Sequence, residues 1–225
     1  MKRLRWFPAL LAAILGLCVM APTASEAAKA KPRERKLDAA FTADIMAPPG
    51  RLLPTTGAIT MWVPRGVRNA GDKMAFCDPA AIQARGLRTC PLRSIVGSGK
   101  ASGLIVFISQ TAVEPLRVTL VNGPGNTLLA HVFGTNPVSI DVVIQSVIRR
   151  LGGKYGMELY FPFPDELIHP VPGSTASLIH LESRLDPKAG WLRSTSCPTR
   201  GWSLGAMLSN IDGSATKITA DLACV

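Results

Sequence analysis

Short apolar segments that alternate with polar residues recur along most of this chain, and glycine, proline and asparagine separate them. Alternation with a period of two places every second side chain on the same face, which is typical of a half-buried β-strand. The C-terminus is the clearest example. Apolar residues alternate over 202–208, turn residues follow at 210–213, and alternation resumes over 216–224. This pattern predicts a C-terminal β-hairpin.

The same pattern predicts strands further upstream. Residues 140–151 are open to two interpretations, because their apolar positions fit helical spacing while their many β-branched residues favour a strand; we favour the strand. Eight or nine strands with turn signals at short spacing predict one antiparallel β-sandwich, immunoglobulin-like or jelly-roll-like, over residues 37–225. The remaining strands are expected at 58–63, 104–109, 117–121, 127–133, 155–161 and 177–183.

One short helix is expected between Cys77 and Cys90. Asp78 is a good N-cap residue, Pro79 suits the first helical position, and Gly86 suits the position after the last turn. These signals predict a helix over 80–85 whose two ends lie close to cysteines.

The first 27 residues have the three parts of a secretory signal peptide. Basic residues stand at positions 2, 3 and 5, an apolar run follows over 6–20, and small residues lead to Ala27. The apolar run is shorter than the roughly 20 residues that a transmembrane helix needs. We therefore expect cleavage after Ala27, no membrane span in the mature protein, and secretion to the cell envelope or the extracellular space.

A basic stretch, residues 28–36, follows the predicted cleavage site. It contributes to the excess of basic residues in the whole chain, which has 25 Lys and Arg against 15 Asp and Glu. We interpret residues 28–36 as a flexible leader that can make weak contact with anionic polymers of the envelope. Few aromatic residues accompany the basic ones, so the stacking platform for single-stranded nucleic acid is missing and no nucleic acid partner is expected.

Four cysteines remain after the predicted cleavage, namely Cys77, Cys90, Cys197 and Cys224. They lack the C-x₂-C spacing of zinc sites, and an oxidising compartment favours disulfides. Four cysteines allow three pairings. We favour the local pairing of Cys77 with Cys90 and of Cys197 with Cys224, because period two places Cys224 on the inward face of the last strand.

No catalytic, cofactor-binding or metal-binding residue is predicted. Residues 97–102 are similar to a phosphate-binding loop, but Ser94 and Ala101 stand where that motif needs Gly and Ser/Thr. The three histidines, His131, His169 and His180, are the bases with ordinary pKa values near neutrality. They could form a metal or hydrolase site if the fold brought them to one point.

Residues 76–103 carry the most distinctive motif: Phe76-Cys77, the expected helix, Thr89-Cys90-Pro91, and then S-I-V-G-S-G-K-A over 94–101. This stretch resembles a group of exported proteins from high-GC Gram-positive bacteria with the pattern C…C-P-x-x-S-x-V-G-x-G-x-A and no established function. The resemblance implies an exported β-rich domain with paired cysteines. Gly97, Gly99 and Gly103 within a strand-like run predict a bulge or the close approach of another backbone.

These observations predict a secreted, non-catalytic β-sandwich with a binding or structural role, and a macromolecular partner at the cell surface. A first alternative is a carrier that encloses a small apolar ligand in a barrel-like cavity, which requires inward positions too small to fill the interior. A second alternative is a hydrolase or metal enzyme built on the three histidines.

Overall fold

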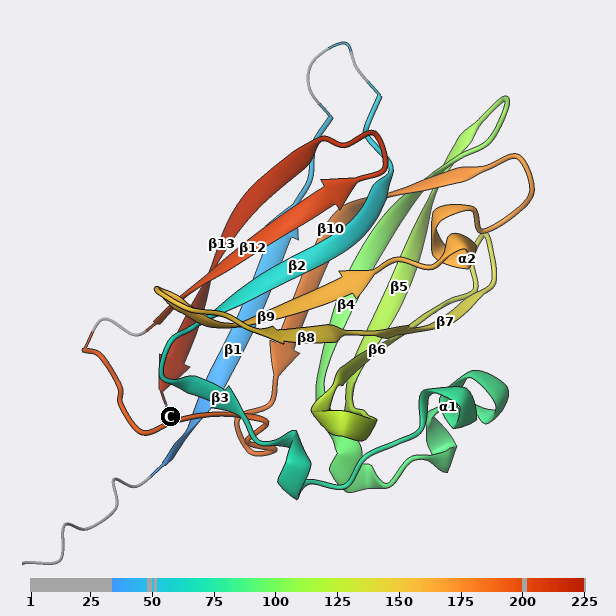
Figure 1. The fold of residues 1–225 in the computed structure, drawn as a ribbon. Helices are drawn as coiled ribbons and strands as arrows, with labels where there is room; N and C mark the ends of the chain where they lie inside the picture. The colour runs from blue at the N-terminus through green and yellow to red at the C-terminus, as the bar shows by residue number, and fades with distance from the viewer. Residues whose placement is uncertain (1–33, 48–49, 51, 200–201, 225) are drawn as a thin grey trace, which may run out of the picture. The chain divides into compact units, whose positions relative to one another are not determined.

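The predicted antiparallel β-sandwich is confirmed by the computed structural model, which describes residues 34–47, 50, 52–199 and 202–224. Figure 1 shows two sheets packed face to face. The described part of the chain contains thirteen strands, more than the eight or nine expected from the sequence.

The strands in chain order are β1 (Arg35–Asp44), β2 (Thr56–Pro64), β3 (Val67–Asn69), β4 (Ile95–Val106), β5 (Thr111–Asn122), β6 (Leu128–Gly134), β7 (Ile140–Gln145), β8 (Val147–Arg150), β9 (Tyr155–Pro162), β10 (Thr175–Leu185), β11 (Leu192–Ser194), β12 (Trp202–Asn210) and β13 (Ala215–Cys224). The helices are α1 (Pro79–Arg85) and α2 (Asp165–Ile168), with 3₁₀ turns η1 (Gly71–Lys73), η2 (Leu87–Thr89), η3 (Leu92–Ser94) and η4 (Pro124–Asn126). In these residues no helix is long and apolar enough to cross a membrane.

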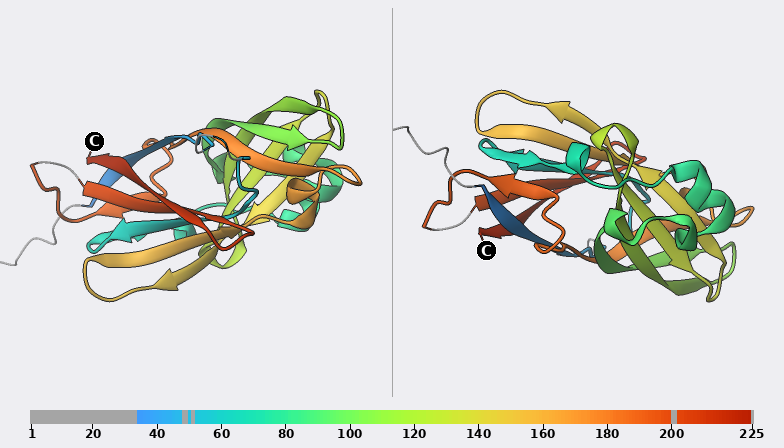
Figure 2. Two further views of the ribbon diagram at one scale, coloured as in Figure 1. Left: turned by 90° about the horizontal axis from the view of Figure 1, so that it is seen from above. Right: turned by 90° about the horizontal axis from the view of Figure 1, so that it is seen from below.

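The strands follow one hydrogen-bonded path in the order β7-β6-β5-β4-β10-β1-β13-β12-β2-β9-β8. The front layer in Figure 1 holds β8, β9, β2, β12 and β13, and the strands from β1 to β7 along the path form the back layer. The two ends of this path, β7 and β8, are separated by Ser146 alone. Since β7 pairs with β6 and β8 pairs with β9, one bent segment joins the layers and closes the path. The views along the sandwich in Figure 2 show the strands wrapping round from one layer into the other.

Ser146 holds the bend between β7 and β8. Its backbone N–H donates to the carbonyl of Leu128 at 2.9 Å, and its buried hydroxyl accepts from the Leu128 N–H at 2.9 Å. The Ser146 side chain thus takes the place of a backbone hydrogen bond to β6. It does so at the residue where the chain stops pairing with β6 and begins to pair with β9. The strand interpretation of residues 140–151 is confirmed.

The first strand lies in the middle of the path, between β10 and β13. Its first residues, Arg35 and Lys36, pair with β11. The expected flexible leader over 28–36 is therefore wrong at its C-terminal end, because backbone pairing with β11 orders these two residues. Glu34, just before them, accepts a hydrogen bond from Arg68 at 2.8 Å, and this bond lowers the pKa of the Glu34 carboxyl. The predicted signal peptide and residues 28–33 lie outside the described residues.

The helix and the first disulfide agree with the sequence. Asp78 accepts a hydrogen bond from the Ala80 N–H at 3.0 Å, and Gly86 ends α1 with a φ of +73°. Cys77 and Cys90 form a disulfide with a Cα–Cα distance of 5.2 Å. The Gln83 amide of α1 donates to the Asp141 carbonyl at 2.7 Å and accepts from the Val143 N–H at 3.1 Å. These two bonds attach α1 to β7.

The motif glycines in β4 allow β10 to approach closely, as predicted. A Cβ on Gly97 would lie 2.3 Å from the Arg184 carbonyl oxygen, and one on Gly99 would lie 2.2 Å from that of Glu182. The pairing of β4 with β5 also shifts register beside Gly97, between Ile95 and Gly97. Gly103 differs, because the nearest atom to its Cβ would be 3.9 Å away.

Candidate functional site

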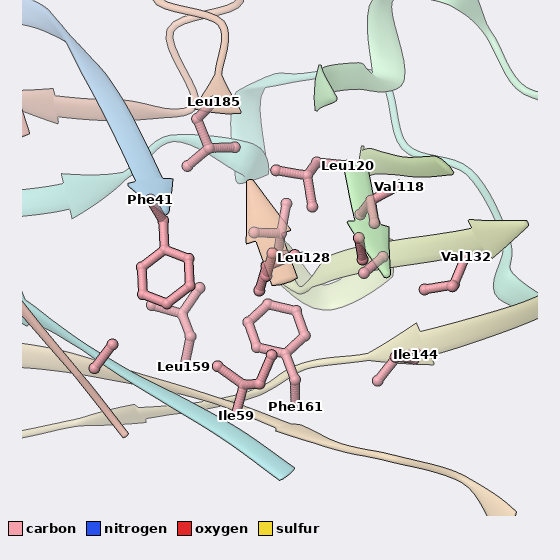
Figure 3. Packing of buried hydrophobic residues seen from close by; sticks show 14 of the residues in the cluster. Phe41, Ile59, Val118, Leu120, Leu128, Val132, Ile144, Leu159, Phe161 and Leu185 are labelled. Carbon is pink, nitrogen blue, oxygen red and sulfur yellow. The ribbon is translucent and has the colours of Figure 1, made fainter. Parts of the chain in front are cut away.

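A cavity of about 130 Å³ lies in the core between the two layers. Figure 3 shows Phe41, Leu120 and Phe161, from three different strands, directed toward the same interior space. Both layers contribute large apolar side chains to the lining, including Ile59, Leu159, Phe161 and Leu204 from the front layer and Phe41, Ile105, Leu116, Leu120, Leu128, Ile140 and Leu181 from the back layer. The strands position these residues by simple alternation, since every second residue of a strand faces inward.

Small residues at inward positions leave this space open. Ala39, Ala101, Gly103 and Ala130 all line the cavity, from β1, β4 and β6. Each stands where a Leu or Ile would extend two or more carbon atoms further into the interior. The sequence-based carrier hypothesis requires inward positions of this kind, and the structure contains them.

The lining is almost entirely apolar. Among the described lining residues, Glu114, Ser177 and Ser183 have polar side chains. Glu114 is fully buried on β5, and its carboxylate accepts from the backbone N–H groups of Asn136 at 3.0 Å and Val138 at 2.9 Å. The carboxylate therefore stabilises the loop between β6 and β7.

Trp191 lines the cavity and is held by a buried amide. Its indole Nε1–H donates to Asn122 Oδ1 at 2.9 Å. The Asn122 side-chain NH₂ donates in turn to the carbonyls of Gly71 at 3.0 Å and Ala75 at 3.1 Å. Asn122 and Trp191 are 0% and 1% exposed. This network, which we call the Asn122 node, fixes β5, η1 and the segment before β11 against one another.

The short helix α2, which packs against β10 and β7, also contributes to the lining. Leu167 of α2 is buried and lines the cavity, together with Phe163 just before the helix and Ala176 on β10. This short helix was not expected from the sequence.

The size and lining of the cavity define what can bind there. An engineered cavity of roughly 150 Å³ lined by Leu, Ile and Phe stays dry and binds benzene. The cavity here is similar in volume and in chemistry. It suits a compact apolar molecule of about the size of a single aromatic ring.

The three histidines do not converge on a common site. His131 lies on β6 beside Asp141 at 2.7 Å, and His180 lies on β10 beside Asp44 at 2.7 Å. Two strands, β5 and β4, separate β6 from β10, and the register through them brings Arg184, not His180, into line with His131, so the two histidines do not meet. Within the described residues, no cluster of three or more His, Cys, Asp or Glu is arranged to hold a metal ion.

His169 follows α2 and has its own partners. Its Nδ1 lies 2.9 Å from the Ser174 carbonyl oxygen, and its Nε2 lies 3.9 Å from Asp165. The buried Ser174 hydroxyl donates to the Val171 carbonyl at 2.7 Å. That hydroxyl is therefore engaged in a tight turn and is not positioned as a nucleophile with His169 as its base.

The second predicted disulfide stays a prediction. Cys197 has a partner, but the side chain of Cys224 lies outside the described residues. We expect proteolysis without reduction to yield one peptide pair linked through Cys77 and Cys90 and another linked through Cys197 and Cys224. Mass spectrometry of these peptides distinguishes the three possible pairings, and a peptide that joins Cys197 to any other cysteine would contradict the assignment.

No family model, curated protein or solved structure matches this chain in any of the three comparisons. The resemblance to exported proteins of high-GC Gram-positive bacteria stays a prediction. The candidate site thus depends on its geometry alone.

Sequence reasoning missed Glu114, Asn122 and Trp191 as residues that shape the cavity. Glu114 lies in a segment that had no assigned strand, and Asn122 looked like an ordinary turn residue. A weak signal exists for Glu114, because it precedes Leu116, Val118 and Leu120 at intervals of two and so occupies the same inward face.

Proposed function

We propose that this protein is a secreted, non-catalytic binding protein that carries a small apolar molecule inside its β-sandwich. The observation that supports this proposal is the apolar cavity of about 130 Å³ between the layers. Its size follows from small residues at inward positions of β1, β4 and β6. Burial of an apolar ligand there is favoured by about 25 cal/mol for each Å² of apolar surface removed from water.

The three histidines lie apart, and the described residues give each of them a local partner. Each histidine interacts with a different carboxylate or carbonyl, as is typical of structural histidines. The predicted signal peptide and the Cys77–Cys90 disulfide support export to an oxidising compartment.

Toluene is a suitable probe for the cavity. We expect it to raise the melting temperature of the purified protein by about 3 °C when its concentration is ten times its Kd, since binding then stabilises the folded state by about 1.4 kcal/mol. Replacing Ala130 with Leu should abolish this shift because the larger side chain occupies the cavity. Differential scanning calorimetry with and without toluene measures both effects.

Ala223→Leu is the matched control. Ala223 is an exposed position on β13, paired with Asp38, so the same change adds a side chain outside the cavity and the toluene shift should persist. If toluene leaves the melting temperature of the unaltered protein unchanged, the proposed carrier function is wrong. If toluene does raise it, native mass spectrometry of protein exported by a bacterial host identifies the natural ligand as a mass that is lost on denaturation.

A further inference from the structure

A second candidate binding surface lies on the outer side of the front layer, away from the cavity. Three aromatic residues, Trp62 on β2 and Tyr155 and Tyr160 on β9, are half-buried on this face. The Trp62 and Tyr155 ring centroids are 6.1 Å apart, with an interplanar angle of 32°. With Arg65, Arg149 and Lys154 around them, we call these six residues the aromatic–basic face.

Gly205 on β12 explains how the rings are oriented. It pairs directly with Trp62, and a Cβ at Gly205 would lie 3.0 Å from Trp62 Cε3 and 2.9 Å from the Tyr155 hydroxyl oxygen. The two aromatic side chains therefore cover the bare backbone of Gly205 and lie down along the sheet. This arrangement places the two rings, inclined to each other by 32°, over the paired strands β2 and β12.

Positive charges surround the rings. The Lys154 ammonium lies 5.2 Å from the Tyr155 ring centroid. The Arg65 backbone N–H donates to the Lys154 carbonyl at 3.0 Å, so these two exposed cationic residues are main-chain neighbours just before β9. Arg149 lies on β8, and its guanidinium is 3.4 Å from Glu158. In the described part of the chain neither Arg65 nor Lys154 has an acidic partner, so the face has an excess of positive charge.

Glu158 is the acidic residue in the centre of this face, opposite Trp62 on the neighbouring strand. Its Oε2 accepts from the Trp62 Nε1–H at 3.0 Å, and its Oε1 accepts from Arg149 at 3.4 Å. These two bonds fix the carboxylate in place, and each oxygen retains a lone pair for another donor. Such a carboxylate can accept hydrogen bonds from the hydroxyl groups of a sugar, whereas a phosphodiester group has no donor to offer it.

We propose that the aromatic–basic face binds an anionic polysaccharide. A sugar ring presents C–H groups that pack on a flat aromatic surface, and its hydroxyls can donate to Glu158. Acidic groups of the polymer would pair with Arg65 and Lys154. Charge complementarity therefore selects an anionic polymer, and the central carboxylate favours a polysaccharide over a nucleic acid. This inference is independent of the proposed ligand in the cavity.

The experiment measures binding of polygalacturonate to the whole protein by isothermal titration calorimetry. Neutral dextran and a single-stranded oligonucleotide are tested in parallel. We expect binding of polygalacturonate alone, with an affinity that falls as salt is raised because ion pairs are screened. Trp62→Ala should weaken binding about tenfold. The double variant Arg65→Ala/Lys154→Ala should weaken it to a similar extent and reduce the salt dependence.

Lys100→Ala is the control variant, since Lys100 is an exposed cation on β4 in the other layer and its loss should leave the affinity unchanged. Trp62→Phe retains an aromatic ring and tests stacking if Trp62→Ala unfolds. Near-ultraviolet circular dichroism confirms that each variant is folded. The inference is overturned if the folded protein does not bind polygalacturonate, if dextran or the oligonucleotide binds equally well, or if the variants of this face bind as tightly as Lys100→Ala.

Discussion

Replacing Asn122 with Ala is expected to lower the free energy of unfolding by about 3–5 kcal/mol. The change removes the partner of the Trp191 indole N–H and of the Gly71 and Ala75 carbonyls, in a region where Asn122 is fully buried. Buried polar groups that lose their partners keep the full cost of desolvation. Urea denaturation followed by circular dichroism measures the effect.

Asn69→Ala is the comparison for the Asn122 node. The Asn69 side chain donates a single hydrogen bond, to the Asn126 carbonyl at 3.1 Å, and is only partly buried. We expect its loss to cost about 1 kcal/mol. Equal effects at Asn69 and Asn122 would show that the buried node does not hold this end of the sandwich together.

Gly99→Ala is expected to destabilise the protein by about 3 kcal/mol, at the upper end of the usual range for overpacking. The added Cβ would lie 2.2 Å from the Glu182 carbonyl oxygen and 2.9 Å from the Ser183 Cα, both in the backbone of β10. Backbone atoms in a paired strand cannot move aside as a flexible side chain can, so β4 and β10 would have to separate. Thermal unfolding of the variant measures the loss.

The matched control for Gly99→Ala lies on the same strand. Gly103→Ala adds the same methyl group where the nearest atom is 3.9 Å away, and we expect a change within about 0.5 kcal/mol. If both variants lose the same stability, backbone flexibility rather than close approach explains the glycines. The spacing Gly-x-Gly at 97–99 would then have no steric cause.

Much of the sandwich could be predicted because apolar and polar residues alternate in the sequences of most of its longer strands. The C-terminal hairpin, the helix with its Asp78 cap and the Cys77–Cys90 disulfide all depend on local signals. The first strand was missed although its residues alternate inward and outward, because two of its buried positions are only Ala39 and Ala43 and it begins within a basic stretch. The three-residue strands β3 and β11 are too short to show a period.

The sequence could indicate that a cavity exists, but it could not indicate where the cavity lies or which residues line it. Small residues in the predicted strands indicated incompletely filled space in the interior. The position of that space depends on which strands face one another, and pairing between distant segments sets this. Trp191 and Asn122 illustrate this limit, since 69 residues separate the donor from its acceptor. Glu114 likewise bonds to a loop more than 20 residues further along the chain. No local pattern encodes such partners.

The placement of β1 sets the order in which this chain can complete its fold. The strand that is synthesised first has its permanent neighbours in β10 and β13, which are among the last segments to be made. During synthesis β1 therefore stays unpaired with these strands until they have been made. The large sequence separation between β1 and its two partners makes folding slow. In the export that the predicted signal peptide indicates, this delay would keep the chain extended during transport. A chain cut short before β13 would keep one side of β1 open to pair with another molecule.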